Sequence, residues 1–363
     1  MDVGMSLFLQ SPDYHEERHE DVPEHGSDLE TFRNELELAC AAEALGFDSL
    51  WSVEHHFTGY TMVPEAAQLL AYVAARSERI RLGTMVLVAP WHNPARMVGA
   101  VSMLDNLSGG RFILGIGRGL GRIEFDGFGV PMGEARGRFV EAAEIVLTGL
   151  EKGYIEYDGE YYKVPKRTVR PAPVRSFRGR TYAAAVSPES LRIMAKLGVG
   201  LLVMPQKPWP TLQAELAEYR GIFEEMHGEP PPPPIVCCHI YCDEDEARAT
   251  ELGGHYIARY YGNAMKHYEL AGDHFAGTKD YEYYEQTARK LQHHGQEKAT
   301  HWYADLHIYG TPDQCVDKIA HVKEITGCEH FLGQFSYAGI PYDDARRNMV
   351  LYSEKVLPRL KAM

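Results

Sequence analysis

Residues 54–58, Glu-His-His-Phe-Thr, place a carboxylate, two imidazoles, an aromatic ring and a hydroxyl next to one another. Imidazoles and carboxylates are the side chains that most often transfer protons near neutral pH, so Glu54 and His55 are candidates for acid–base chemistry. The segment follows a short apolar run at residues 46–53, which predicts a buried strand that ends at the site. Two histidines in a loop can also be merely solvated, an alternative that weakens if other strands end in the same way.

The next two predicted strands also end in polar or basic residues. Residues 80–88 lead into Trp91 and His92, and the following strand leads into a glycine-rich segment that contains Gly117 and Arg118. Glycines let backbone N–H groups approach an anion, and an arginine can bind phosphate oxygens bidentately, so this loop predicts a phosphate site. The glycine spacing does not match the motif of nicotinamide-binding folds. A tight turn with a surface arginine remains the alternative.

A second anion-binding element is predicted after the apolar residues 181–186. Ser187 and Pro188 are typical of the N-cap and the first position of a helix, and Ser190 follows within the first turn. The N–H groups and hydroxyls at such a helix N-terminus attract anions. Together with Arg118, this helix start predicts where a phosphate would bind.

Eight apolar runs alternate with helical patterns along the chain, and these elements must position the polar residues described above. The runs cover residues 3–9, 46–53, 80–88, 111–117, 181–186, 200–204, 235–242 and 329–335. Strands that alternate with helices form parallel sheets, and eight such units favour a single (βα)8 TIM barrel of the α/β class. In that fold the active site lies at the carboxyl ends of the strands, where Glu54, His55 and Arg118 are expected.

Two segments do not fit the alternation and predict insertions in a single domain that covers residues 1–363. Tyrosines alternate with polar residues on either side of Asp158-Gly159, which predicts a hairpin within an insertion at about residues 151–170. Residues 254–306 are polar and rich in tyrosine and histidine, and they precede the last βα unit. This long insertion is expected to act as a lid that excludes water, although an insertion without a role or a dimer surface is an equal alternative.

The 363-residue chain has a net charge of −14, from 51 acidic and 37 basic residues, which argues against nucleic acid or an anionic membrane as its partner. No apolar run approaches the length of a membrane span, and the first residues show no basic leader, so a cytoplasmic enzyme is expected. The six cysteines form no C-x-x-C pair. They are therefore expected to be free thiols, without a disulfide framework or a zinc site.

Four stretches in register resemble the flavin-dependent monooxygenases of the bacterial luciferase-like superfamily, and the resemblance covers nearly the whole chain. They are the Glu-His-His-Phe-Thr segment, residues 108–120 with the glycine-rich loop, residues 182–190, and Gly-Thr-Pro at residues 310–312 with Cys315. The resemblance implies a barrel that holds reduced FMN, with its phosphate near Arg118, Ser187 and Ser190. Gly117 and Val186 fall at further cofactor positions, where the luciferases carry a reactive cysteine and an acidic residue, so light emission is not predicted.

The resemblance also implies a catalytic role for His55. This residue matches the histidine that family members require for flavin oxidation or proton transfer, and Glu54 or His92 could also carry the proton. His56 is expected to point the other way if the alternation of the strand persists. The family places a cis peptide bond after the third strand, at positions that match Met85-Val86.

The predicted function is that of a two-component monooxygenase. A separate flavin reductase would supply reduced FMN, because the sequence has no nicotinamide-binding motif, and O2 would be the co-substrate. Phe57, Trp91 and Trp209 are expected to wall a dry pocket for an apolar carbonyl or hydrocarbon-like small molecule. Proteins that resemble this chain commonly pack helices beside the second and third strands in dimers, so a homodimer is expected.

Three other interpretations remain open. A deazaflavin-dependent dehydrogenase on the same barrel would transfer hydride without oxygen, although one arginine and two hydroxyls suit the bare phosphate of FMN better. A non-catalytic flavin-binding subunit is expected to lack the site histidine, which this chain has as His55. A metallohydrolase would need convergent ligands such as His55, His92 and His239, and no metal is predicted.

Overall fold

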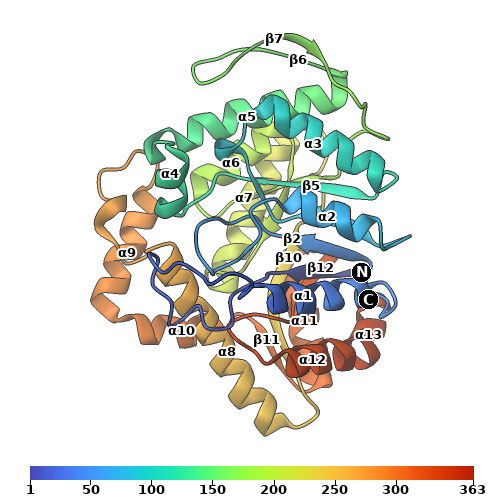
Figure 1. The fold of residues 1–363 in the computed structure, drawn as a ribbon, viewed down its shortest axis with the longest axis vertical. Helices are drawn as coiled ribbons and strands as arrows, with labels where there is room; N and C mark the ends of the chain where they lie inside the picture. Colours follow the sequence, from blue (N-terminus) through green and yellow to red (C-terminus); the bar gives the residue numbers. More distant parts are fainter.

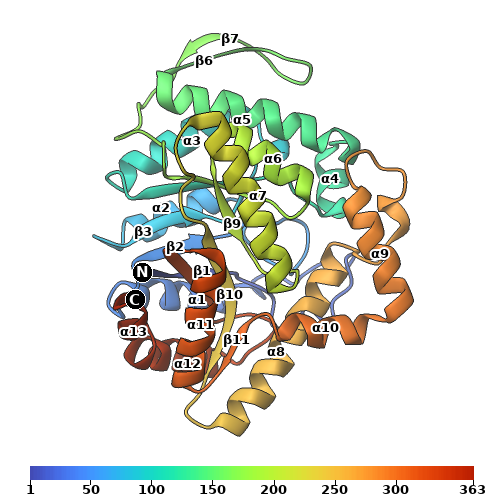
Figure 2. The same cartoon turned by 180° about the vertical axis from the view of Figure 1, so that it is seen from behind.

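The computed structural model describes residues 1–363, apart from the side chain of His294. Eight parallel strands close into a barrel with helices on its outside (Figure 1, Figure 2). In barrel order the strands are β1 (Asp2–Leu7), β2 (Ser49–Ser52), β3 (Arg81–Thr84), β5 (Phe112–Gly117), β8 (Thr181–Ala184), β9 (Gly200–Val203), β10 (Ile235–Cys242) and β12 (His330–Gln334). The barrel closes because β12 pairs with β1, from Asp2 opposite His330 to Ser6 opposite Gln334. The predicted (βα)8 barrel is confirmed.

The helices around the barrel bury one face, and some of them begin at a side chain that caps the first turn. α3 (Pro94–Leu107) follows Asn93, whose side-chain oxygen accepts hydrogen bonds from the backbone N–H groups of Ala95 and Arg96. The others are α1 (Leu29–Ala42), α2 (Ala66–Ala74), α5 (Ala135–Lys152), α6 (Pro188–Leu197), α7 (Trp209–His227), α11 (Pro312–Thr326) and α12 (Tyr342–Lys355). Because each helix returns the chain to the same end of the barrel, the loops after the strands gather at the opposite end.

Large side chains fill the inside of the barrel. Trp51 on β2 is fully buried in a cluster with Ile113, Leu202 and Leu332 from other strands. Gly83 on the neighbouring strand β3 leaves room for the Trp51 ring, since a Cβ atom there would collide with the indole. The packed interior leaves the space beyond the carboxyl ends of the strands as the place for a ligand.

Three elements differ from the sequence prediction. The third predicted strand, residues 80–88, is divided into β3 and β4 (Leu87–Val88), and the expected cis peptide bond at Met85-Val86 lies between them. The last helical pattern of the sequence, at residues 343–360, forms two helices, α12 and α13 (Leu357–Lys361), because Pro358 has no N–H group with which to continue α12. A further strand, β11 (Ile308–Gly310), extends the sheet beside the end of β10 and is too short to show a strand pattern.

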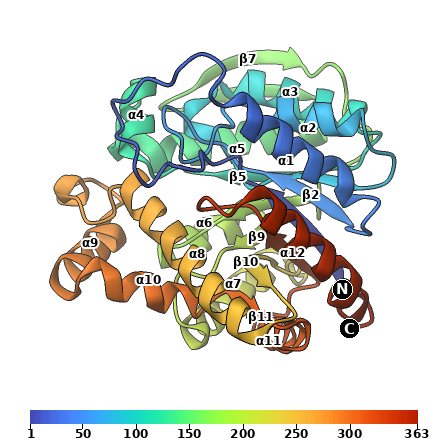
Figure 3. The same ribbon diagram turned by 60° about the horizontal axis from the view of Figure 1, so that its bottom comes forward.

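Both predicted insertions lie outside the barrel. β6 (Tyr154–Asp158) and β7 (Lys163–Thr168) form the antiparallel hairpin, which lies beside α5 at the edge of the molecule (Figure 1). Between β10 and β11 the chain forms α8 (Glu246–His267), α9 (Glu282–His294) and α10 (Gln296–Ala304). Figure 3 shows α9 and α10 projecting to one side of the barrel next to α8. The short helix α4 (Arg122–Phe128), which the sequence pattern does not predict, follows β5.

None of the described helices is long and apolar enough to cross a membrane. The six cysteines are free, and all but Cys40 are buried. Cys237, Cys238 and Cys242 lie within β10, where they pack as small apolar side chains.

Candidate active site

A large cavity opens at the carboxyl ends of the barrel strands. The loops after β2, β4, β5 and β8 form part of its wall, and tyrosines from α8, α9 and α10 form another part. Eight of the residues that the sequence singles out line this cavity: Glu54, His55, Met85, Trp91, Gly117, Arg118, Val186 and Ser190. The fold therefore brings the acid–base candidates and the predicted phosphate-binding residues to one place.

Three other predicted site residues do not line the cavity. Phe57 is about half exposed, and its ring packs against Phe128 of α4 at a centroid distance of 5.1 Å. Trp209 is the first residue of α7 and packs against the core between the helices and the barrel. Ser187 is the N-cap of α6, and its Oγ atom accepts a hydrogen bond from the N–H group of Ser190.

The imidazole of His55 is held from both sides. Its Nδ1 atom lies 2.9 Å from Oε1 of Glu124, and its Nε2 atom lies 3.1 Å from the hydroxyl of Tyr268. The backbone N–H group of His56 also donates to Glu124 Oε1, at 3.0 Å. Because a carboxylate only accepts hydrogen bonds, Nδ1 of His55 carries a hydrogen, and in the neutral imidazole Nε2 then presents a lone pair.

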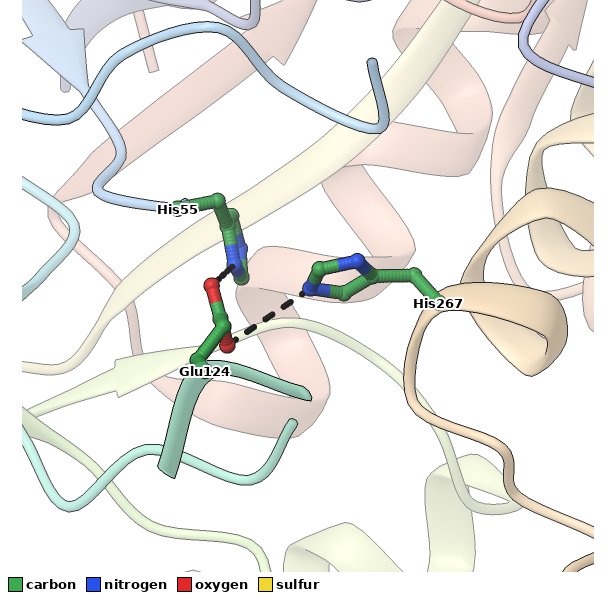
Figure 4. A group of neighbouring side chains, drawn as sticks. All are labelled: His55, Glu124 and His267. Carbon is green, nitrogen blue, oxygen red and sulfur yellow. Dashed lines mark hydrogen bonds and ion pairs between the residues drawn. The ribbon is translucent and has the colours of Figure 1, made fainter. Parts of the chain in front are cut away.

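Glu124 lies between two imidazoles from different parts of the chain (Figure 4). Its second oxygen, Oε2, lies 3.5 Å from Nε2 of His267, and Nδ1 of His267 lies 3.0 Å from the hydroxyl of Thr58. Burial would raise the pKa of Glu124, but His55 and His267 outweigh it and lower this pKa to about 2. Burial lowers the pKa of His267 to about 4. At neutral pH the group is therefore a carboxylate beside a neutral His267.

The same three residues have the spacing of a possible metal site. One ligand atom from each of His55, Glu124 and His267 lies within 4.8 Å of the others. The ligands considered from the sequence do not converge: Nε2 of His92 bonds to Glu54, and His239 is buried beside His307. The hydrogen bonds from His55 and from the His56 backbone already satisfy Glu124 Oε1, so the arrangement also works as a proton-holding network without a cation.

Glu54 has a different set of partners. Its buried carboxylate accepts hydrogen bonds from His56 Nε2 at 3.0 Å, His92 Nε2 at 2.8 Å and the Val88 N–H group at 2.9 Å. Burial would raise the pKa of Glu54, but His56 and His92 keep it below its usual value. Glu54 therefore ties the loop after β2 to the loop after β4. As the strand alternation predicts, His55 and His56 contact different partners.

Two guanidinium groups and the start of α6 form a cationic end of the cavity. Arg118 donates from Nη1 to the backbone oxygen of Asp280 at 3.0 Å, and its guanidinium lies 4.4 Å from the ring centre of Tyr281. Arg136 donates from Nη1 to Asp280 Oδ1 at 2.9 Å. The Nε atom of Arg136 is buried and has no hydrogen-bond partner among the described residues. This unpaired donor, with Arg118 and the hydroxyl of Ser190, is suited to an anion such as a phosphate.

Sequence reasoning misses four residues of this site: Glu124, Arg136, His267 and Tyr268. Arg136 could have been detected from the sequence, because it lies at the start of a predicted helix after the glycine-rich loop. Glu124 lies on a seven-residue helix whose pattern is too short to be recognised. His267 and Tyr268 are members of a histidine- and tyrosine-rich segment, so residue type alone does not distinguish them.

The sequence comparisons identify a family. The model of the luciferase-like monooxygenase family matches residues 1–329 of this chain. The alkanal monooxygenase alpha chain of Photorhabdus luminescens is 26% identical over 345 residues, which cover 93% of this chain and 95% of that protein.

Solved structures share the fold over its whole length. Monooxygenase RslO1 from Streptomyces bottropensis has a TM-score of 0.79 and 26% identity, and the match covers 99% of both chains. The oxygenating constituent of 3,6-diketocamphane monooxygenase from Pseudomonas putida, in complex with FMN, has a TM-score of 0.73 and 19% identity over 99% of this chain and 98% of that chain. An F420-dependent secondary alcohol dehydrogenase has a TM-score of 0.71 and 16% identity over the same shares. From the extent of the family match, this chain belongs to the luciferase-like monooxygenase family of flavin-dependent oxidoreductases.

Proposed function

We propose that this chain is the oxygenase of a two-component FMN-dependent monooxygenase. It would use reduced FMN and O2 on an apolar carbonyl or hydrocarbon-like small molecule. The observation that carries the proposal is the placement of His55, whose Nε2 lone pair is oriented by the buried Glu124 in the same cavity as the arginine pair. An oriented proton carrier and an anion-binding end in one cavity are what such an enzyme needs.

The residues of the cationic end fit the phosphate of FMN. Arg136 Nε is a buried donor that lacks a partner among the described residues, and a phosphate oxygen would satisfy it. Arg118 and Ser190 line the same part of the cavity, and we propose that they bind the phosphate together with the N-terminus of α6 and its cap Ser187. Met85, Gly117 and Val186 also line the cavity and are proposed to contact the flavin ring.

The proposed chemistry divides between cofactor and protein. Bound reduced flavin would supply the electrons for the reaction with O2. His55 would accept or deliver a proton at Nε2, and the Glu124 carboxylate would stabilise the imidazolium while the proton is held there. Trp91 and the tyrosines of the long insertion would exclude water from the cavity. Glu54 would act indirectly, by holding the loops on which His55 and Trp91 lie.

A deazaflavin-dependent dehydrogenase is the second candidate, because an F420-dependent enzyme shares the fold. F420 is a deazaflavin, which transfers hydride and does not need O2. A non-catalytic flavin-binding subunit is a third candidate, and it would have no use for the oriented His55. Binding of the two reduced cofactors to the same protein separates the first two candidates.

We also propose the wider setting of the enzyme. The chain has no nicotinamide-binding motif, so a separate flavin reductase would deliver the reduced FMN. We propose a cytoplasmic homodimer in which each chain is one domain with insertions at about residues 151–170 and 254–306. Sedimentation analysis tests the dimer, and a reductase-coupled oxygen-consumption assay tests the need for the second protein.

The function is tested by anaerobic titration with reduced FMN, followed by rapid mixing with oxygenated buffer while the flavin absorbance is recorded. The wild type is expected to bind reduced FMN and to delay the return of oxidised-flavin absorbance relative to free FMN. His55→Ala is expected to bind but to change that delay, whereas His25→Ala, at an exposed position, is expected to match the wild type. Preferential binding of reduced F420 would favour the deazaflavin-dependent dehydrogenase. Reoxidation of the flavin at the rate of free FMN would favour the deazaflavin-dependent dehydrogenase or the non-catalytic subunit.

A further inference from the structure

The end of α8 reaches His55, the proposed catalytic histidine, from the long insertion. His267 is the last residue of α8, and Tyr268 is its C-cap. His267 faces Glu124, and the neighbouring Tyr268 places its hydroxyl 3.1 Å from His55 Nε2, although 213 residues separate the two in sequence. Two adjacent residues of the insertion therefore contact both members of the His55–Glu124 pair.

The direction of the Tyr268 hydrogen bond follows from the other bonds of His55. In the neutral form of His55, Nδ1 donates to Glu124, so Nε2 has no hydrogen and can only accept. The Tyr268 hydroxyl must therefore donate to it. Burial raises the pKa of Tyr268 well above the value of a free phenol, so the hydroxyl keeps its hydrogen at neutral pH.

The position of Tyr268 leaves its oxygen available to a bound molecule. Tyr268 and His55 both line the cavity, and the Tyr268 hydroxyl contacts His55 Nε2 and also the side chain of Tyr60. The hydroxyls of Tyr60 and Tyr260, by contrast, are paired with each other at 2.9 Å. Tyr303 of the wall also has an imidazole partner, the buried His239 at 3.4 Å, whereas the partner of Tyr268 is His55, which lines the cavity.

We propose that Tyr268 relays a proton between His55 and the molecule bound in the cavity, so that the insertion completes the acid–base site. The inference rests on the proposed function. In the relay, the Tyr268 O–H bond breaks as an N–H bond forms at His55 Nε2, and the Tyr268 oxygen takes a proton from an acidic N–H or O–H group of the flavin or substrate bound in the cavity. The bound molecule becomes an anion, and His55 becomes an imidazolium beside the Glu124 carboxylate. The reverse transfer returns the proton.

The first test needs no cofactor. In protein labelled with 15N-histidine, the imidazole nitrogens of His55, assigned by their loss in His55→Ala, are expected to show hydrogen on Nδ1 and an accepting Nε2. Tyr268→Phe removes the donor and is expected to shift the Nε2 resonance. Tyr256→Phe is the matched control, because Tyr256 lies on α8 outside the cavity lining and stacks on Tyr241. An Nε2 resonance that is the same in Tyr268→Phe and wild type would overturn the hydrogen bond and with it the relay.

The second test is a double-mutant cycle in the flavin-loaded protein. The rate of return of oxidised flavin after mixing with O2 is compared for wild type, His55→Ala, Tyr268→Phe and the double variant. A relay predicts that Tyr268→Phe slows the proton-dependent rate by about 10²-fold and that the double variant is no slower than His55→Ala. Losses that multiply, an unchanged rate or a faster rate in Tyr268→Phe would each overturn the relay. Failure of the wild type to bind reduced flavin would instead overturn the proposed function, and the imidazole spectra would still report on the hydrogen bond.

Discussion

Nδ1 of His55 lies 2.9 Å from Oε1 of Glu124, and the two residues are 69 positions apart in the sequence. The contact exists because the loop after β2 and the short helix α4 after β5 meet over the same end of the barrel. It sets the tautomer of His55 and so decides which ring nitrogen faces the cavity. The proposed chemistry depends on this contact more than on any other.

Glu124→Gln is expected to slow the proton-dependent step by about 10²-fold. The amide keeps the shape of Glu124 but can donate a hydrogen, which would turn His55 to the tautomer with hydrogen on Nε2. Rapid-mixing kinetics measure the rate, and anaerobic titration checks that reduced FMN still binds. Asp126→Asn, on the exposed side of α4, is the matched control and should behave as wild type. Wild-type kinetics in Glu124→Gln would show that Glu124 does not orient His55.

Arg118→Ala is expected to weaken FMN binding about 10- to 100-fold and to leave riboflavin binding unchanged. The reason is that a hydrogen bond to a charged group is worth about 1.5–3 kcal/mol, and riboflavin has no phosphate. Titration of both ligands by flavin fluorescence gives the comparison. Arg192→Ala is the control, because Arg192 lies on α6 but is exposed and pairs with Glu218. Equal weakening of FMN and riboflavin would place Arg118 away from the phosphate.

Gly117→Ala is expected to destabilise the protein by about 1–3 kcal/mol and to weaken flavin binding. A Cβ atom at Gly117 would collide with the Cγ2 methyl of Val86, which lines the same cavity. The double variant Gly117→Ala/Val86→Ala should recover much of the lost stability, because the smaller side chain at position 86 leaves room for the new methyl group. Gly254→Ala on α8 meets no atom within 4 Å and should not destabilise the protein. Denaturant unfolding compares the wild type with Gly117→Ala, Val86→Ala, their double variant and Gly254→Ala, and additive losses in the double variant would contradict the steric explanation.

Stability is expected to fall as the pH drops below about 6.5, in part because of His307. Burial lowers the pKa of His307 to about 3, so between pH 6.5 and 3 the unfolded chain binds a proton that the folded chain does not. The contribution of neutral His307 to the free energy of unfolding is fully present above pH 6.5. About 2 kcal/mol of this contribution is lost by pH 5, because each pH unit below 6.5 removes about 1.36 kcal/mol. Glu35 changes the stability in the opposite direction as the pH falls, because burial raises its pKa to about 7 and the folded chain then binds the proton more tightly than the unfolded chain.

Comparison with His307→Asn isolates this effect, since Glu35 is the same in both proteins. Asparagine keeps an acceptor for the His239 N–H group, which bonds to His307 Nδ1 at 3.1 Å, but it does not titrate. The free energy of unfolding of the variant is therefore expected to change about 2 kcal/mol less between pH 7.5 and pH 5 than that of the wild type. Parallel pH profiles of the two proteins would rule out His307 as the source.

Much of the fold and part of the site could be predicted from the sequence. Strand and helix patterns are local, so eight apolar runs and capping residues such as Ser187 were enough for the barrel. Glu54, His55 and Arg118 were placed near one another because all three follow strands whose carboxyl ends meet in this fold. Phe57 and Trp209 show the limit of such reasoning, because residue type gives no direction to a side chain, and neither of them lines the cavity.

Only the tertiary structure decided the partners of these residues. Glu124 comes from a helix too short to leave a pattern, and His267 and Tyr268 come from an insertion that crosses back over the barrel end. Such contacts depend on where distant segments pack, and the local periodicity of the sequence does not indicate which distant segments will meet. The sequence by itself determined the barrel and the residues that could do chemistry; the packing of α4 and α8 over the barrel end decided the tautomer of His55 and what it contacts.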